Sequence, residues 1–259
     1  MGTDLKQGTK TIINISAILA MAVLRSPQID PHPSMSSATS LPATEGHIPL
    51  SVPSAGKPCQ TWYKIIGDLK SGRPLVALHG GPGVNSDYLL ILSEITKAHS
   101  HPLVVYDQIG TGLSTHLPEK MGDTSFWTDD LFLDELHNLL STLGIQEDYD
   151  LIGHSWGGML AARHAVRKPS GLKHLVLVST PADMQIWIKA QNELRLKLPQ
   201  DIQKILEKHE KADTTESKDY QDAVGVFYSR HLCILNPMPP EILAGFGWIA
   251  KDPTVYLTM

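Results

Sequence analysis

Apolar residues recur along the middle of the chain in two ways, as short strand-like runs and as helix-like spacings. Residues 47–52 and 61–66 alternate between apolar and polar positions, which is typical of half-buried antiparallel strands. Two other runs, residues 75–78 and 103–106, are continuously apolar, and such runs predict strands that are buried on both faces of a sheet. Residues 150–152 are predicted to form another buried strand, and residues 172–178 one more strand.

Segments with helical spacing separate these predicted strands. Leucines fall on one face of a helix predicted over residues 130–143, and Gly144 ends it. A helix of small residues is predicted over 158–168, where Pro169 closes it. Buried strands that alternate with helices predict an α/β fold with a mostly parallel sheet covered on both sides.

Only helical patterns follow this α/β region. The predicted helices are residues 184–196, 199–211, 218–232 and 240–251. A wholly helical block after an α/β core predicts a cap. We therefore expect four parts, which are a disordered or targeting-like extension (1–45), a core (46–183), a helical cap (184–251) and the start of a return to the core (252–259).

The N-terminal part has a different composition. Residues 11–24 are mostly apolar and follow two lysines, as in a signal peptide, but the run is too short for a membrane span. Residues 26–43 are rich in Pro, Ser and Thr and are typical of a linker. We favour a non-native or disordered extension on a cytoplasmic protein. The alternative is secretion, if residues 1–22 act as a signal peptide.

The composition also bears on partners and cofactors. The net charge is −5 and there is no basic stripe, so neither a nucleic-acid partner nor a membrane partner is expected. The two cysteines, Cys59 and Cys233, lie in distant segments, so we expect them to stay reduced inside a cell. None of the 12 histidines has metal-site spacing, so no metal or other cofactor is expected. The sequence does not indicate an oligomeric state.

The pentapeptide GHSWG at 153–157 lies between the predicted strand 150–152 and the helix that follows it. This strand–turn–helix context is the one that a G-x-S-x-G nucleophile elbow requires. The serine sits in a strained turn, so the residues two before and two after it must be small, and Gly153 and Gly157 meet that need. We predict that Ser155 is a nucleophile. The alternative interpretation is a glycine-rich turn with an idle serine.

A second glycine motif, HGGPG at 79–83, follows the predicted strand 75–78. Acyl transfer develops negative charge on a carbonyl oxygen, which backbone N–H groups can stabilise. In hydrolases with this elbow, one donor is the residue after the nucleophile and the other comes from such a loop. We therefore predict an oxyanion hole formed by the amides of Trp156 and Gly81, with Gly80 as the second choice for the loop donor.

The segment DQIGTGLS at 107–114 resembles a dinucleotide-binding loop, but its third glycine is missing. We interpret it as a structural loop in which Asp107 hydrogen-bonds to nearby backbone. By chain order, Asp183 and His231 could formally serve as the acid and base of a triad. A base must lie within hydrogen-bond reach of the serine hydroxyl, and a histidine in the predicted cap is a poor candidate. We interpret His231 as a packing or capping residue.

Taken together, the motifs HGGPG, DQIGTGLST and GHSWGG resemble those of the prolyl aminopeptidases, or proline iminopeptidases, of the α/β-hydrolase superfamily. The segments VGVFYSRHLCILNPMP and WIAKDPTVYLTM are similar to the fungal and bacterial proline-specific branch. The resemblance implies an α/β-hydrolase fold. It also implies a serine peptidase that removes N-terminal proline or other residues from small peptides or amides through an acyl-enzyme on Ser155.

The resemblance also implies parts for which this chain has no counterpart. In the family, the triad aspartate, the triad histidine and the glutamates that bind the substrate amine come after the position that matches Met259. We therefore predict that the nucleophile, oxyanion hole and cap are present. The last sheet strands and the triad Asp and His are not in this chain, and we expect it to have little activity as it stands.

Two other functions stay open at this point. One is an esterase or amidase that acts on another small acyl substrate, since one fold hosts many such chemistries. The other is a non-catalytic protein of the same fold that binds a ligand without turnover. A dehalogenase or epoxide hydrolase is disfavoured, because those enzymes need a carboxylate at the position of Ser155.

Overall fold

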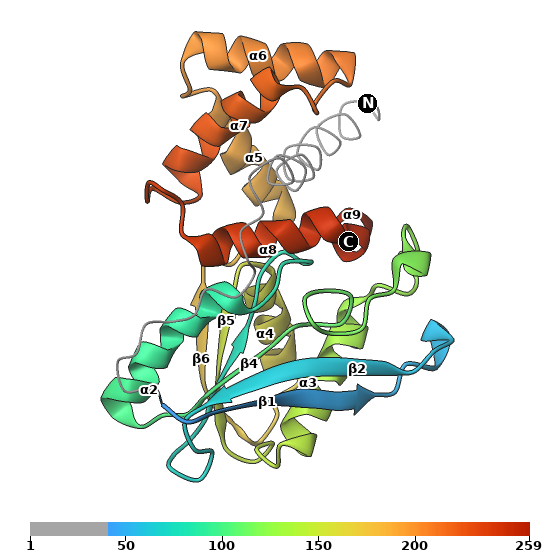
Figure 1. The fold of residues 1–259 in the computed structure, drawn as a ribbon, viewed down its shortest axis with the longest axis vertical. Coiled ribbons are helices and arrows are strands. Elements are labelled where there is room, and N and C mark those ends of the chain that lie inside the picture. Colours follow the sequence, from blue (N-terminus) through green and yellow to red (C-terminus); the bar gives the residue numbers. More distant parts are fainter. Residues whose placement is uncertain (1–40) are drawn as a thin grey trace. The chain divides into compact units, whose positions relative to one another are not determined.

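The structure is a computed structural model that describes residues 41–259. Its centre is a six-stranded sheet in the order β1-β2-β4-β3-β5-β6 (Figure 1). The strands are β1 (Ala43–Leu50), β2 (Cys59–Ile66), β3 (Leu75–Leu78), β4 (Leu103–Tyr106), β5 (Tyr149–His154) and β6 (Leu172–Val178). Strands β1 and β2 form an antiparallel hairpin, and β2 pairs antiparallel with β4. Strands β4, β3, β5 and β6 are parallel neighbours, so the predicted mostly parallel sheet is confirmed.

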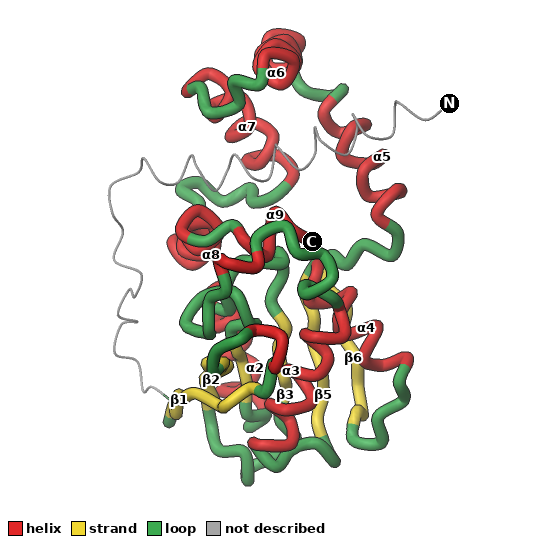
Figure 2. Tube along the Cα trace, turned by 90° about the vertical axis from the view of Figure 1, so that its right-hand side faces the viewer, coloured by secondary structure: helices red, strands yellow, loops and turns green. Residues whose placement is uncertain are grey.

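Alternate residues of the central strands enter two different apolar clusters, which explains why these runs are continuously apolar. Val76 and Val104 face a large cluster that includes Leu136 of α3 (Asp129–Thr142) and Leu160 of α4 (Trp156–Val166). Val105 faces the other side. There the covering side chains come from a 3₁₀ helix, Asp87–Leu92, which α2 (Ser93–His99) continues. Helix α4 runs along β5 and β6 (Figure 2).

Two compact units divide the described chain. One is Ala182–Lys251, which holds α5 (Met184–Arg195), α6 (Gln200–Ala212), α7 (Lys218–His231) and α8 (Pro240–Lys251). Its own apolar cluster is centred on Leu206, Tyr220 and Phe227. All four predicted helices of this block are present. The side chain of Asp183 caps α5 by accepting from the amides of Gln185 and Ile186, at 2.7 and 3.2 Å.

The last eight residues, Asp252–Met259, belong to the unit that contains the sheet. Val255, in the short helix α9 (Thr254–Thr258), is 1% exposed and joins the main apolar cluster. Asp252 Oδ2 lies 2.6 Å from His116 Nδ1, and the Thr258 hydroxyl accepts from the amide of Gly122 at 2.9 Å. This segment therefore contacts the loops that follow β4.

Strand β6 pairs with β5 on one side, and no other strand among residues 41–259 pairs with it. Val176, Leu177 and Val178 are 47%, 47% and 38% exposed. The described residues therefore cover this strand poorly and leave its apolar side chains at an exposed edge. An exposed apolar edge is a site where strands of other chains can pair.

The predicted extension, together with the choice between a disordered tail and a signal peptide, falls almost entirely outside the described residues. Within residues 41–259, no helix combines the length and apolar character needed to cross a membrane.

Candidate active site

Ser155 occupies the turn between β5 and α4, with φ 54° and ψ −120°. Positive φ is rare for a residue with a side chain and marks local strain. A Cβ atom added to Gly153 would overlap the carbonyl of Gly157, and one added to Gly157 would overlap the carbonyl of Leu78. The sharp turn expected at Ser155 is thus present, and its neighbouring glycines are required by close backbone contacts.

The HGGPG loop runs next to this turn. A Cβ atom added to Gly80 would lie 3.1 Å from the Cβ atom of Ser155. The Gly80 amide donates to the phenol oxygen of Tyr88 at 2.7 Å, so it already has a partner. Gly81 has φ +114°, and Trp156 is the first residue of α4, where an amide has no partner within the helix. This geometry favours Gly81 over Gly80, while the oxyanion hole itself stays a prediction.

A buried hydrogen-bond network joins three of the motifs. His79 is fully buried, with its Nδ1 atom 2.9 Å from the Gly80 carbonyl oxygen. Its Nε2 atom accepts from the backbone amide of Gln108 at 3.0 Å. The Gln108 side chain donates to the His79 carbonyl at 3.1 Å and accepts from the Trp156 indole at 2.9 Å. Burial lowers the pKa of His79 to about 4, so its ring is neutral at neutral pH.

Asp107 has a structural role in the loop after β4. Its carboxylate accepts from the amide and the hydroxyl of Ser86, at 2.9 and 2.8 Å, and from the Leu113 amide at 2.8 Å. The expectation that Asp107 hydrogen-bonds to nearby backbone is confirmed. Burial raises its pKa to about 6 in spite of these donors. A Cβ atom on Gly112 would overlap this carboxylate, so the glycine gives the carboxylate room.

The two formal triad candidates have other partners within their own unit. Asp183 caps α5, as described above, and the ring of His231 lies 4.9 Å from the ring of Phe227, centroid to centroid. His154, which precedes the serine, lies 2.9 Å from the Tyr88 hydroxyl through its Nδ1 atom. Among residues 41–259, no group of three or more His, Cys, Asp or Glu side chains could hold a metal ion.

Residues 73–234 match a family model described as the alpha/beta hydrolase fold, and this match covers more than half of the chain. The chain belongs to the α/β-hydrolase family. Its members share the elbow-and-loop arrangement that Ser155 and the HGGPG loop display.

Several proteins that are similar to this α/β-hydrolase are named proline iminopeptidases. The proline iminopeptidase of Clostridium botulinum is 36% identical over 203 residues, which are 77% of this chain and 65% of that protein. The crystal structure of proline iminopeptidase from Mycobacterium smegmatis is 37% identical, with a TM-score of 0.71 over 82% of this chain and 69% of that one. The crystal structure of VinJ is 49% identical, with a TM-score of 0.78 over 83% and 70% of the two chains. The chain spans 59–65% of the length of the first three curated relatives that it matches.

A buried carboxyl group beside the candidate site was not predicted from the sequence. Glu135 of α3 is fully buried and accepts hydrogen bonds from the Thr61 hydroxyl and the Ile109 amide. Burial raises its pKa to about 8, and the nearby Asp107 carboxylate adds to the rise. Helical spacing could have predicted the burial of Glu135, because position 135 lies three residues after Phe132 and therefore on the same buried face of the helix.

Replacing Glu135 with glutamine is expected to remove a pH-dependent loss of stability. An acid whose pKa is raised in the folded state binds more protons there than in the unfolded chain, so the wild-type free energy of unfolding falls as pH rises. Between roughly pH 5 and 8, the free energy of unfolding of the wild type should fall relative to that of Glu135→Gln, by up to about 1.4 kcal/mol per pH unit. Urea unfolding at several pH values measures this difference. The exposed Glu147→Gln serves as control, and parallel curves for wild type and Glu135→Gln would contradict the prediction.

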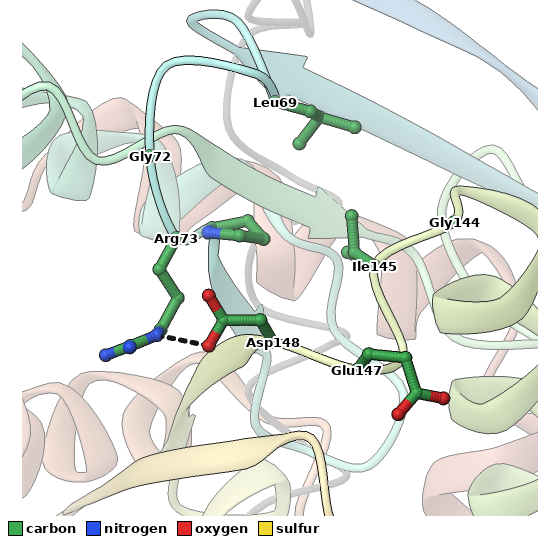
Figure 3. Close-up of a pocket in the computed structure, with 8 residues that line it drawn as sticks. Leu69, Gly72, Arg73, Gly144, Ile145, Glu147 and Asp148 are labelled. Atoms are coloured by element: carbon green, nitrogen blue, oxygen red, sulfur yellow. Dashed lines mark hydrogen bonds and ion pairs between the residues drawn. The ribbon is translucent and has the colours of Figure 1, made fainter.

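A hollow of about 230 Å³ lies between residues 69–74 and 144–148, where the half-buried Arg73 donates to Asp148 at 2.7 Å (Figure 3). These segments precede β3 and β5, whereas Ser155 follows β5. The hollow is therefore at the opposite edge of the parallel sheet from the candidate nucleophile. A second hollow, of about 310 Å³, lies within the helical unit beside α7 and is lined by Tyr228 and Ile234 among others.

Proposed function

We propose that Ser155 is the nucleophile of a serine hydrolase of the proline iminopeptidase type. In this proposal the whole protein removes N-terminal proline, or another N-terminal residue, from small peptides or amides and needs no cofactor. The observation that carries the proposal is the strained backbone of Ser155 at the head of α4, with the HGGPG loop beside it. Similarity to proteins named proline iminopeptidase supports the substrate class. The cytoplasmic location stays a prediction.

In the proposed reaction, the Ser155 hydroxyl attacks the carbonyl carbon of the N-terminal residue. The negative charge that develops on the carbonyl oxygen is stabilised by the amides of Gly81 and Trp156. The bond between the carbonyl carbon and the leaving amine breaks, the amine takes the proton given up by the Ser155 hydroxyl, and water then hydrolyses the acyl-enzyme and restores that hydroxyl. The N-terminal end of α4 also stabilises this negative charge, because the helix dipole places partial positive charge there.

The proton of the Ser155 hydroxyl needs an acceptor. Within residues 41–259, no histidine is hydrogen-bonded to that hydroxyl, and the neighbouring His154 directs its Nδ1 atom to Tyr88. The family resemblance assigns the base and its orienting acid to positions after Met259. We therefore propose that these 259 residues provide the nucleophile and its oxyanion hole but not the base.

A covalent serine reagent tests this proposal without requiring turnover. Phenylmethanesulfonyl fluoride should label Ser155 slowly but in preference to exposed serines such as Ser71 and Ser229, because Ser155 lies at the elbow, beside the proposed oxyanion donors. Peptide mapping by mass spectrometry locates the label, and Ser155→Ala is the control. Labelling of the exposed serines with none at Ser155 would reject the proposal.

A further inference from the structure

Tyr88 lies where the HGGPG loop meets the elbow. It belongs to the 3₁₀ helix Asp87–Leu92, on the face of the sheet opposite α3 and α4. Its phenol oxygen is 2.7 Å from the Gly80 amide nitrogen and 2.9 Å from His154 Nδ1. The rings of Tyr88 and His154 meet edge to face, with centroids 5.3 Å apart. One hydroxyl group therefore contacts both the loop and the residue that precedes Ser155.

The direction of the hydrogen bond to Gly80 follows from elementary donor chemistry. A backbone N–H can only donate, so the Tyr88 oxygen accepts from Gly80. The single phenol proton is then available for His154, and an Nδ1 atom that accepts it carries no proton. Burial agrees with this assignment, since it raises the pKa of Tyr88 above its ordinary value and lowers the pKa of His154. Both groups are therefore neutral at neutral pH, and in the order that we propose below the His154 proton lies on Nε2.

We propose that Tyr88 is a positioning residue, whose hydroxyl fixes the HGGPG loop against the elbow by accepting from Gly80 and donating to His154. With the Gly80 amide held in this way, Gly81 is the loop residue whose amide is left for the oxyanion. The inference deepens the proposed function and rests on it for the identity of the nucleophile. The hydrogen-bond order itself stands on the contacts of Tyr88 alone.

A tyrosine that only packs would behave differently from a positioning tyrosine. Leu89, Leu103 and Val105 form the apolar cluster against which the Tyr88 ring packs. Phenylalanine retains that ring and removes only the hydroxyl. Tyr88→Phe therefore separates the two roles. The matched control is Tyr63→Phe, which removes the same group from a half-buried tyrosine of β2.

Two spectroscopic measurements test the hydrogen-bond order directly. In the wild type, ¹⁵N spectra of labelled histidine should show His154 with an unprotonated Nδ1, and His154→Asn identifies its signal among the others. The Gly80 amide should exchange slowly with solvent deuterium. In Tyr88→Phe, the His154 signals should move toward a mixture of tautomers and the Gly80 amide should exchange faster. A wild-type His154 protonated on Nδ1, or unchanged Gly80 exchange in Tyr88→Phe, would overturn the proposal.

The link to catalysis is tested by the rate at which phenylmethanesulfonyl fluoride labels Ser155. Losing one hydrogen bond that holds the loop should slow labelling about threefold to tenfold in Tyr88→Phe, whereas Tyr63→Phe should match the wild type. Equal rates in all three proteins would overturn the positioning role. If the wild type is not labelled at Ser155 at all, the proposed function fails, and the histidine and exchange measurements still decide the order of hydrogen bonds around Tyr88.

Discussion

Gly157→Ala is expected to destabilise the unit that carries Ser155 by about 3 kcal/mol or more. A Cβ atom at this position would overlap the carbonyl groups of Leu78 and His79. These are backbone atoms at the end of β3, so no side-chain rotation can relieve the overlap. Relief requires α4 to move away from the sheet, which opens the main apolar cluster around Leu160.

Urea unfolding followed by tryptophan fluorescence measures this effect, since Trp127 and Trp156 belong to the same unit. The matched control is Gly225→Ala in α7, where nothing lies within 4 Å of an added Cβ atom. There alanine should be neutral or stabilise by up to about 1 kcal/mol, because it favours helix more than glycine does. Wild-type stability in Gly157→Ala would show that the elbow relaxes more easily than its contacts indicate.

The parts of the fold that one local pattern determines were predictable from the sequence. Strands β3 and β4 have the predicted bounds, because an unbroken apolar run has clear ends, and β6 has its predicted bounds as well. Strand β1 begins at Ala43, four residues before the predicted start. Its first residues are mostly polar or small and become strand only because they pair with β2, as Ala43 does with Ile66. Such pairing leaves no periodic signal in the sequence.

The residues of the candidate site likewise fall into those that a local pattern predicts and those that it does not. Ser155 and the two glycine motifs were found because each glycine is required by a local backbone constraint. The hydrogen-bond partners of Gln108, Tyr88 and Glu135 were missed because they are distant in the sequence, although the burial of Glu135 could be read from its helical spacing. Gln108, for example, bonds to Trp156, 48 residues away. Nothing in the local pattern shows that a glutamine side chain will join two loops, so this part of the site required the structure.

The 259-residue chain is expected to hydrolyse proline p-nitroanilide at least about 10⁴-fold more slowly than the Mycobacterium smegmatis proline iminopeptidase measured beside it. Without a base, the Ser155 hydroxyl is protonated at neutral pH and is a weak nucleophile. Loss of triad members costs on the order of 10⁴ to 10⁶ in turnover and leaves the contribution of the oxyanion hole and binding. The two formal substitutes have other partners, since Asp183 caps α5 and His231 packs on Phe227.

The comparison must separate a missing base from a chain that does not fold. Selective labelling of Ser155 by phenylmethanesulfonyl fluoride in the same preparation shows that the elbow has formed, so slow hydrolysis then reports on the base. Ser155→Ala sets the background rate, and the expected difference between it and the wild type is small. Turnover within about 100-fold of the relative, lost in Ser155→Ala, would mean that a base exists within these residues. Asp183→Asn and His231→Gln would then be the first variants to test, because these residues follow Ser155 in the chain order acid, then histidine.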